Sequence, residues 1–318
     1  METKLTRSAK IYDNSQLSTY KDCPRKYFLR HVKDWRSEGT AIPLVFGLSW
    51  HAGQDIVWQY ARKLSGQGEL ATAAMAKFLE TWEEEGLPAE MSLEDAERYA
   101  PRTPMIAHEM YESYIRDRWN MLMEAKVLAV EQPFAVPMPG REDTWYVGRL
   151  DKVISFNGQT LVIEHKTTTA YKKDGGFQSS YIDGWYTDSQ IKGYQFGGSL
   201  YFNNLTQVWV DAALVHKKEH NHFRFVPVAH QMPIIQEWIK DTGDWITRVE
   251  SDFERNYFPK NENSCMGKFG PCTFLDICRT TPDNAIPQEP PAGYMVERWE
   301  PFDVLKLEKL TNESSSEK

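Results

Sequence analysis

The 318-residue sequence has no long hydrophobic run, and its first residues (METKLTRSAKIYDNSQ) contain no apolar stretch typical of a secretory signal. A membrane helix needs roughly 20 predominantly apolar residues in a row, and a signal peptide contains an apolar region of about 7–15. We therefore expect a cytoplasmic protein with no membrane partner. Cysteine is also scarce, with four in the chain. In a reducing compartment, such cysteines are more often metal ligands, catalytic groups or buried side chains than disulfides.

Two familiar binding motifs are missing as well. The sequence contains no GxxxxGK[ST] phosphate-binding loop, so helicase activity is not encoded in this chain. It also lacks the compact CxxC pair of structural zinc sites. The net charge of −8 argues against a general nucleic-acid coat, because phosphate binding needs positive charge. Residues 21–36 nevertheless contain six Lys or Arg against two Asp. This basic strip fits a DNA channel, although on charge alone a solvated helix face is the simpler interpretation.

Apolar spacing and turn residues predict helices first, then a hairpin-rich sheet, a crossover helix, further strands and a final helix. A short first helix, capped by Asn14 or Ser15, is interrupted at Pro24. The other predicted helices cover residues 47–64, 69–84, 104–126, 189–203 and 232–257, and the predicted strands cover 127–134, 145–156, 160–167, 207–216 and 222–226. We expect one domain over residues 1–280, with a helical insertion at about 65–126. The remaining 281–318 form a Pro-rich and then polar tail that frays at SSSEK.

The segment from Gly148 to Thr167, GRLDKVISFNGQTLVIEHKT, carries the clearest chemistry. The dipeptide Asn157-Gly158 between runs rich in Val, Ile and Leu predicts a two-residue β-hairpin loop. In that register Asp151 lies opposite Glu164, with Cβ atoms roughly 4.5–5.5 Å apart. Two carboxylates so placed repel each other unless a cation or a shared proton joins them.

The residues after Glu164 complete this candidate site. Lys166 points to the same face as Glu164, whereas His165 points away. Mg²⁺ typically binds one or two protein carboxylates, and a lysine beside it can orient or deprotonate water or neutralise developing charge. The alternative is an exposed network in which Lys166 pairs with Glu164 and Arg149 pairs with Asp151.

Four residues outside the hairpin are further candidates. His51, on a predicted helix, and Glu131, on the preceding strand, could each complete a metal shell. Gln190 and Tyr194 are four residues apart and so share one face of the helix over 189–203, from which they could contact phosphate or base. Taken singly, His51 and Glu131 are better explained as structural or surface residues, and the alternative for Gln190 and Tyr194 is a polar helix face.

Three of the four cysteines lie close together, in the pattern C-x6-C-x5-C at Cys265, Cys272 and Cys278, while Cys23 is more than two hundred residues earlier. Thiolates bind zinc or iron–sulfur clusters. The alternative is four independent buried cysteines. The Gly- and Pro-containing segment 265–278 has little core-forming pattern, so a bound metal cluster would order it and connect it to Cys23.

Together these motifs resemble the RecB-type branch of the PD-(D/E)XK nuclease superfamily, especially its iron–sulfur members, the AddB nuclease domain and the CRISPR adaptation exonucleases. The matching sequences are SQLSTYKDCPRKY around Cys23, FGLSWHAG around His51, GRLDKV at Asp151, IEHKT at Glu164 to Lys166, QIKGY at Gln190 to Tyr194, and CTFLDIC at Cys272 and Cys278. Each motif is short, but all occur in the family's order. One departure is that six residues separate Cys265 from Cys272, where two are usual.

The resemblance implies an α/β fold with a restriction-endonuclease-like mixed sheet flanked by helices, an N-terminal helical elaboration and a C-terminal metal-cluster segment. It also implies roles for the candidate residues. Mg²⁺ or Mn²⁺ would be bound by His51, Asp151, Glu164 and the carbonyl of His165, and Lys166 would be the catalytic lysine. Gln190 and Tyr194 would support the active site and DNA, and a [4Fe–4S] cluster, with zinc as the alternative, would be bound by Cys23, Cys265, Cys272 and Cys278.

The function implied is a metal-dependent DNA nuclease, an exonuclease on single-stranded DNA or DNA ends, in phage or bacterial recombination, repair or CRISPR adaptation. Its partners would be DNA and either a second copy of the chain or a recombination or adaptation protein. The basic strip, residues 21–36, would guide single-stranded DNA. The alternative is a non-catalytic nucleic-acid-binding or assembly module with a structural iron–sulfur or zinc site.

Overall fold

The computed structural model describes residues 10–39, 41–172, 175–267 and 270–298. The chain forms two compact units, each built from segments that are distant in the sequence. Unit 1 consists of Met1–Gly39, Pro133–Gly148 and Met232–Lys318, and unit 2 consists of Thr40–Gln132 and Arg149–Gln231. The assignment of residues 1–280 to one domain stays a prediction. No helix among the described residues combines the length and the apolar character needed to cross a bilayer.

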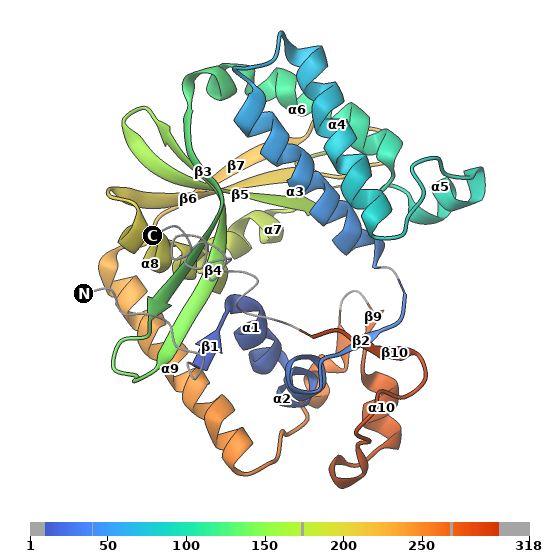
Figure 1. The fold of residues 1–318 in the computed structure, drawn as a ribbon, viewed down its shortest axis with the longest axis vertical. Helices are drawn as coiled ribbons and strands as arrows, with labels where there is room; N and C mark the ends of the chain where they lie inside the picture. The colour runs from blue at the N-terminus through green and yellow to red at the C-terminus, as the bar shows by residue number, and fades with distance from the viewer. Residues whose placement is uncertain (1–9, 40, 173–174, 268–269, 299–318) are drawn as a thin grey trace, which may run out of the picture. The chain divides into compact units, whose positions relative to one another are not determined.

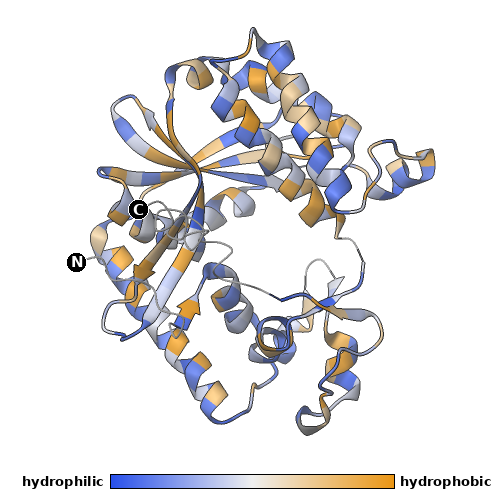
Figure 2. Cartoon of the chain, in the orientation of Figure 1, coloured by the Kyte–Doolittle hydropathy of each residue, from blue (hydrophilic) through white to orange (hydrophobic). Residues whose placement is uncertain are grey.

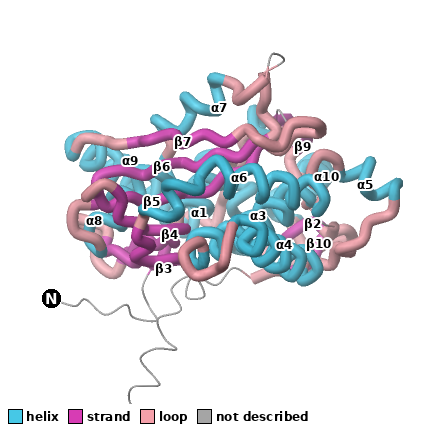
Figure 3. The backbone as a smooth tube through the Cα atoms, turned by 90° about the horizontal axis from the view of Figure 1, so that it is seen from above, coloured by secondary structure: helices cyan, strands magenta, loops and turns pink. Residues whose placement is uncertain are grey.

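A mixed sheet forms the centre of unit 2. Its strands are β3 (Lys126–Pro137) and β4 (Thr144–Phe156), parts of which belong to unit 1, together with β5 (Gln159–Thr168), β6 (Leu205–Leu214) and β7 (Phe223–Val228). Strands β4, β5, β6 and β7 lie side by side in that order (Figure 3). Strands β4 and β5 are antiparallel, β5 and β6 are parallel, and β6 and β7 are antiparallel. The inner strands contain short runs of consecutive buried apolar residues, such as Leu161 to Ile163 of β5, because both faces of the sheet are covered there.

The hairpin between β4 and β5 has the predicted register. Asn157 and Gly158 form the loop with φ of 49° and 76°, the left-handed pair that a type I′ turn requires. Pairing runs from Phe156 opposite Gln159 to Lys152 opposite Ile163. Asp151 and Glu164 are the next residues outward on the two strands.

Helices cover both faces of this sheet. Helices α3, α4 and α6 lie on one face, and α7 and α8 lie on the other (Figure 1). Their bounds, with that of the peripheral α5, are α3 (Ile42–Tyr60), α4 (Gln67–Glu84), α5 (Leu93–Tyr99), α6 (Pro104–Glu124), α7 (Ser179–Gly184) and α8 (Ser189–Tyr201). Helices α7 and α8 belong to the crossover that parallel strands need. The predicted class, a mixed α/β sheet flanked by helices, is confirmed.

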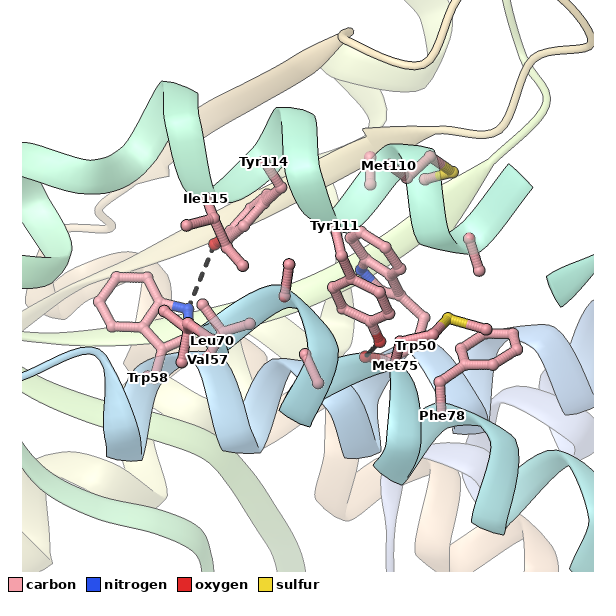
Figure 4. Close-up of a cluster of buried hydrophobic side chains, with 14 of the residues drawn as sticks. Trp50, Val57, Trp58, Leu70, Met75, Phe78, Met110, Tyr111, Tyr114 and Ile115 are labelled. Carbon is pink, nitrogen blue, oxygen red and sulfur yellow. Dashed lines mark hydrogen bonds between the residues drawn. The ribbon is translucent and has the colours of Figure 1, made fainter. Parts of the chain in front are cut away.

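A large aromatic core holds α3, α4 and α6 together and against the sheet (Figure 4). Trp50 of α3 stacks on Tyr111 of α6 with ring centroids 4.3 Å apart. About two turns further along α3 and one turn further along α6, the indole nitrogen of Trp58 donates a hydrogen bond to the Tyr114 hydroxyl at 3.2 Å. Burial of each such side chain contributes roughly 1.5–3 kcal/mol or more. This packing fixes the position of α3, the helix that contains His51.

Unit 1 is built mainly from helices. These are α1 (Asn14–Asp22), α2 (Pro24–Tyr27), a π-helical turn (Phe28–Val32), α9 (Met232–Glu254) and α10 (Leu275–Thr280). Helix α9 is amphipathic (Figure 2), and its buried residues recur every three or four positions: Ile235, Trp238, Thr242, Ile246, Val249 and Asp252. The Tyr20 hydroxyl donates to Asp252 Oδ2 at 2.7 Å and so joins α1 to α9.

The predicted cap of α1 is wrong by one residue. Asp13 caps the helix, and its carboxylate accepts a hydrogen bond from the Gln16 amide at 2.7 Å. Asp13 has the extended backbone that an N-cap needs, whereas Asn14 and Ser15 already belong to the helix.

Several short strands of unit 1 were not predicted from the sequence, because two or three residues show no periodicity. Strand β1 (Lys10–Tyr12) pairs in parallel with the start of β4, and β8 (Met266–Gly267) pairs with β9 (Gly270–Pro271). Strand β2 (Trp35–Ser37) pairs with β10 (Tyr294–Val296), which lies in the segment predicted as a tail. The SSSEK end lies outside the described residues.

Candidate active site

The carboxylates of Asp151 and Glu164 are buried at the end of the β4–β5 hairpin, with 8% and 1% of each residue exposed. The Lys166 ammonium lies 2.5 Å from Glu164 Oε1, as the strand alternation predicted. Asp151 Oδ2 accepts a hydrogen bond from the His165 amide at 2.9 Å and lies 3.2 Å from His51 Nδ1. The structure therefore brings His51 and the three predicted hairpin residues together within unit 2.

The alternative network of exposed cross-strand pairs is only partly realised. Glu164 does pair with Lys166, but both carboxylates of the hairpin are buried. Arg149 pairs with Glu131 at 3.2 Å, where the hypothetical network would join Arg149 to Asp151. Burial raises the pKa of Glu131, and the charge of Asp151 raises it further, so Glu131 lies within the electrostatic field of the site.

The two carboxylates have opposite pKa shifts. Burial, and then the negative charge of Asp151, raise the pKa of Glu164 to about 7. Burial also disfavours ionised Asp151. The charge and hydrogen bond of His51, and then the charge of Lys152, outweigh burial, so the pKa of Asp151 lies well below its usual range. The ionised Asp151 in turn outweighs the effect of burial on His51 and raises the pKa of that imidazole.

Lys166 is held in its charged form. Burial alone would lower the pKa of its ammonium, but Glu164 and Asp151 outweigh burial and raise it. A charged Lys166 donates hydrogen bonds and stabilises negative charge, and it cannot accept a proton.

The residues fit a hard divalent cation by their chemistry. Glu164 Oε2 is buried and has no hydrogen-bond partner in the part of the chain that the structure describes. Carboxylate oxygens are the ligands that Mg²⁺ and Mn²⁺ prefer, and imidazole suits Mn²⁺. Among the described residues, however, no three His, Cys, Asp or Glu side chains are already grouped as a metal-binding set. Glu164 forms an ion pair with Lys166, and Asp151 forms one with His51, so side chains of the protein itself neutralise both carboxylates.

Gln190 and Tyr194 contact each other as their spacing predicted. Gln190 Nε2 donates to the Tyr194 hydroxyl at 2.7 Å. Asp188 caps α8 and accepts hydrogen bonds from the amides of Gln190 and Ile191. The cap fixes where the helix begins, and therefore which side chains share its face. Their contact with DNA stays a prediction.

The side chain of His165 enters a buried polar network that the sequence analysis missed. Its Nδ1 lies 3.2 Å from Asp211 Oδ2 of β6, and both side chains are at most 2% exposed. The Tyr114 hydroxyl donates to the same Asp211 oxygen at 2.5 Å and accepts from Trp58 (Figure 4). Burial, and then the charge of Lys152, lower the pKa of His165 to about 4. The one sequence signal was an Asp within the otherwise apolar run of β6.

The four cysteines line one pocket in unit 1. Cys23, at the break between α1 and α2, lies there with Cys265, Cys272 and Cys278, and all four are free thiols. The Asn261 amide lies 3.3 Å from Cys23 Sγ, in hydrogen-bonding geometry. Burial raises the pKa of Cys265, and the neighbouring Cys23 and Cys272 raise it further, because thiolates so close repel each other. Their convergence agrees with the sequence analysis, while the ligand that they bind stays a prediction.

The segment around these cysteines contributes more core than its sequence suggested. Phe274 and Ile277 are buried against Leu29 and Trp35 in a separate small core of unit 1. This packing attaches the Cys272–Cys278 end of the segment to unit 1 through apolar contacts. That a bound cluster orders the segment stays a prediction.

Most of the positive charge of the basic strip, residues 21–36, is ion-paired, and its guidance of DNA stays a prediction. Four of its six cations form ion pairs, and Arg25 is buried against Asp283 and the Phe258 carbonyl. The other three ion-paired residues of the strip and their partners are Lys26 with Asp22, and Arg30 and Arg36 with Glu297. The acidic partners lie mostly more than two hundred residues away, which is why charge counting in the sequence missed them.

Comparison with known proteins places the chain in a family. The solved structures that are similar include a "putative exonuclease" from Eubacterium rectale, with 13% identity, coverage of 87% of this chain and 90% of the other and a TM-score of 0.48. They also include SSO0001, with 13% identity, coverage of 66% of this chain and 87% of the other and a TM-score of 0.28. At these TM-scores the two likenesses carry no argument. No curated protein matches the sequence. The family model of the PD-(D/E)XK nuclease superfamily matches residues 14–279. The chain belongs to the PD-(D/E)XK nuclease superfamily.

Proposed function

We propose that this protein is a Mg²⁺- or Mn²⁺-dependent deoxyribonuclease that acts as an exonuclease on single-stranded DNA or DNA ends. The observation that carries the proposal is the buried pair of Asp151 and Glu164 at the end of the hairpin, with Lys166 on Glu164 and an unpartnered Glu164 oxygen. A purely structural ion pair would not need a second buried carboxylate or an unsatisfied oxygen, because each costs free energy.

Each residue of the site has a role in this proposal. Asp151, Glu164, His51 and the main-chain carbonyl of His165 would hold the divalent ion. When bound, the ion supplies Lewis-acid activation of water and charge neutralisation at the phosphoryl group. The hydrogen bond from the His165 amide, with His51 beside it, orients the Asp151 carboxylate. Gln190 and Tyr194 would position the DNA.

Lys166 acts in this proposal as a hydrogen-bond donor. Its ammonium is held charged by Glu164 and Asp151, so it is suited to orient the attacking water and to stabilise negative charge on the phosphoryl oxygens. A general-base role would require a pKa close to the working pH, and the neighbouring carboxylates shift the pKa of Lys166 in the opposite direction.

End-labelled single- and double-stranded DNA, incubated with Mg²⁺, Mn²⁺ or EDTA, tests the nuclease assignment. Cleavage should require the metal, and Glu164→Gln and Lys166→Met should each lower its rate by at least about a hundred-fold. Glu80→Gln and Lys77→Met, which alter an exposed ion pair of α4, are matched controls and should keep full activity. Full metal-dependent cleavage by both site variants would refute the proposal.

The same assay separates the finer alternatives. An exonuclease leaves circular single-stranded DNA intact, and the label position gives the direction of cleavage. DNA binding without cleavage by the wild-type protein, in either metal, would instead favour the non-catalytic nucleic-acid-binding or assembly module.

We also infer that Cys23, Cys265, Cys272 and Cys278 hold a [4Fe–4S] cluster. The support is their convergence in one pocket of unit 1, where thiolates need a cationic partner. Anaerobically purified protein should be brown with stoichiometric iron and sulfide, and Cys272→Ser should lose the colour. Colourless protein with stoichiometric zinc would refute the cluster and favour the zinc alternative.

A further inference from the structure

One arginine of unit 2 is partly buried without a counter-charge. Arg102 lies in the turn between α5 and α6, where its Nη2 donates to the Thr169 hydroxyl at 3.4 Å. Its Nε is buried and has no hydrogen-bond partner, and among the described residues no carboxylate forms an ion pair with it. Burial lowers the pKa of Arg102, and no acid in the described part of the chain offsets that effect.

This arrangement leaves most of the guanidinium free to bind an anion. A guanidinium has five N–H donors in a planar fork, and the 3.4 Å contact to Thr169 is long for a hydrogen bond. Removing such a charge from water without a partner costs free energy, which a bound anion recovers. Phosphate matches the fork because two of its oxygens accept parallel hydrogen bonds.

The position of Arg102 connects it to the candidate active site. Thr169 follows directly on β5, the strand that contains Glu164 and Lys166. At roughly 3.3 Å per residue, Thr169 lies on the order of 10 Å beyond Lys166 along the chain. A strand of duplex DNA rises about 3.4 Å per nucleotide, so this distance corresponds to a few nucleotides.

We propose that Arg102, with the Thr169 hydroxyl beside it, binds a backbone phosphate of the DNA a few nucleotides from the scissile bond. The inference rests on the proposed nuclease function and deepens it. It places the DNA backbone along the C-terminal end of β5 and gives the turn between α5 and α6 a role in substrate binding. The basic strip, residues 21–36, is largely ion-paired within unit 1, whereas Arg102 has its charge available.

The test measures DNA binding in a Glu164→Gln background, which keeps cleavage from interfering. Arg102→Gln should weaken binding of an oligonucleotide about tenfold. The slope of the logarithm of the association constant against the logarithm of the salt concentration should fall in magnitude by about 0.7 for single-stranded DNA or about 0.9 for duplex DNA. Arg98→Gln is the matched control, because it removes an exposed arginine of α5, and it should change neither quantity.

Methylphosphonate substitution locates the phosphate. A single neutral linkage, moved along the oligonucleotide, should weaken binding most at one position near the cleavage site, and Arg102→Gln should abolish that effect. Arg102→Lys keeps the charge, so it should keep the salt slope and lose part of the effect at the same position. Arg102→Lys replaces Arg102→Gln in this test if thermal unfolding shows that Arg102→Gln disturbs the turn.

The outcomes separate this proposal from the nuclease assignment. Unchanged affinity, salt slope and methylphosphonate pattern in the Arg102 variants would overturn the phosphate site even if the protein cleaves DNA. Binding that depends on Arg102 in a protein without nuclease activity would support the phosphate site and refute the nuclease. Absence of DNA binding would overturn both.

Discussion

The ion pair between Lys152 and Asp55 offers a sharp test of how the candidate site is held together. Lys152 follows Asp151 on β4, and its side chain is fully buried with Nζ 2.8 Å from Asp55 Oδ1. Asp55 lies one turn of α3 beyond His51, which contacts Asp151. The pair therefore fastens α3 to β4 beside the contact between the imidazole and the carboxylate.

Removal of the carboxylate by Asp55→Ala leaves the Lys152 ammonium buried without a partner. Breaking a buried pair in this way costs about 3–5 kcal/mol. We therefore expect the free energy of unfolding to fall by about 3–5 kcal/mol.

Chemical denaturation of the single and double variants measures this cost. Lys152→Met in the Asp55→Ala background removes the buried charge and should restore most of the lost stability. Glu80→Ala breaks the exposed pair with Lys77 and is the control, with an expected loss below about 1 kcal/mol. A loss below about 1 kcal/mol for Asp55→Ala, or no recovery in the double variant, would refute this account.

Other substitutions probe packing and charge elsewhere. Gly53→Ala places a Cβ against the Tyr111 side chain and should destabilise unit 2 by about 1–3 kcal/mol or more. Gly243→Ala in α9 meets no atom within 4 Å and should stabilise the helix by up to about 1 kcal/mol. Chemical denaturation checks both, because the two midpoints should shift in opposite directions. Burial, and then Arg30, lower the pKa of His31 to about 4, so the unfolded chain binds the proton more tightly. Stability should therefore be full above about pH 6.5 and decline as the pH falls towards about 4, and His31→Gln should flatten that decline in urea titrations at several pH values. An equal decline in wild type and variant would exclude His31 as its cause.

Local patterns predicted the hairpin well because its geometry is set within the segment. Asn157-Gly158 fixes the loop, the loop fixes the register, and the register brings Asp151 and Glu164 to adjacent positions. The long helices followed from apolar periodicity within a few residues of their observed ends, whereas the short α5, α7 and α10 were not predicted. These features depend on contacts between residues that are near one another in the sequence, so the sequence displays them directly.

The remaining features depend on partners distant in the sequence. Arg30 and Arg36 of the basic strip pair with Glu297, and no local pattern connects residues so far apart. Asp211 meets His165 because β6 lies parallel to β5, a pairing that requires the whole crossover to be in place. Arg102 showed no signal, since the absence of a counter-charge is visible only in three dimensions.

His165, the middle residue of the sequence Glu164-His165-Lys166, connects the candidate site to the buried polar network of Asp211 and Tyr114. Alternation along β5 directs Glu164 and Lys166 to one face and the imidazole of His165 to the other, where it contacts Asp211. The amide of the same residue donates to Asp151, so His165 fixes the site through its backbone and the helical core through its side chain. Tyr114 of α6 donates to Asp211 of β6, so this chain of contacts runs from α6 through Asp211 and His165 to the Asp151 carboxylate. Stability of the buried network and geometry of the candidate site are consequently not independent, and substitutions in the network should change both.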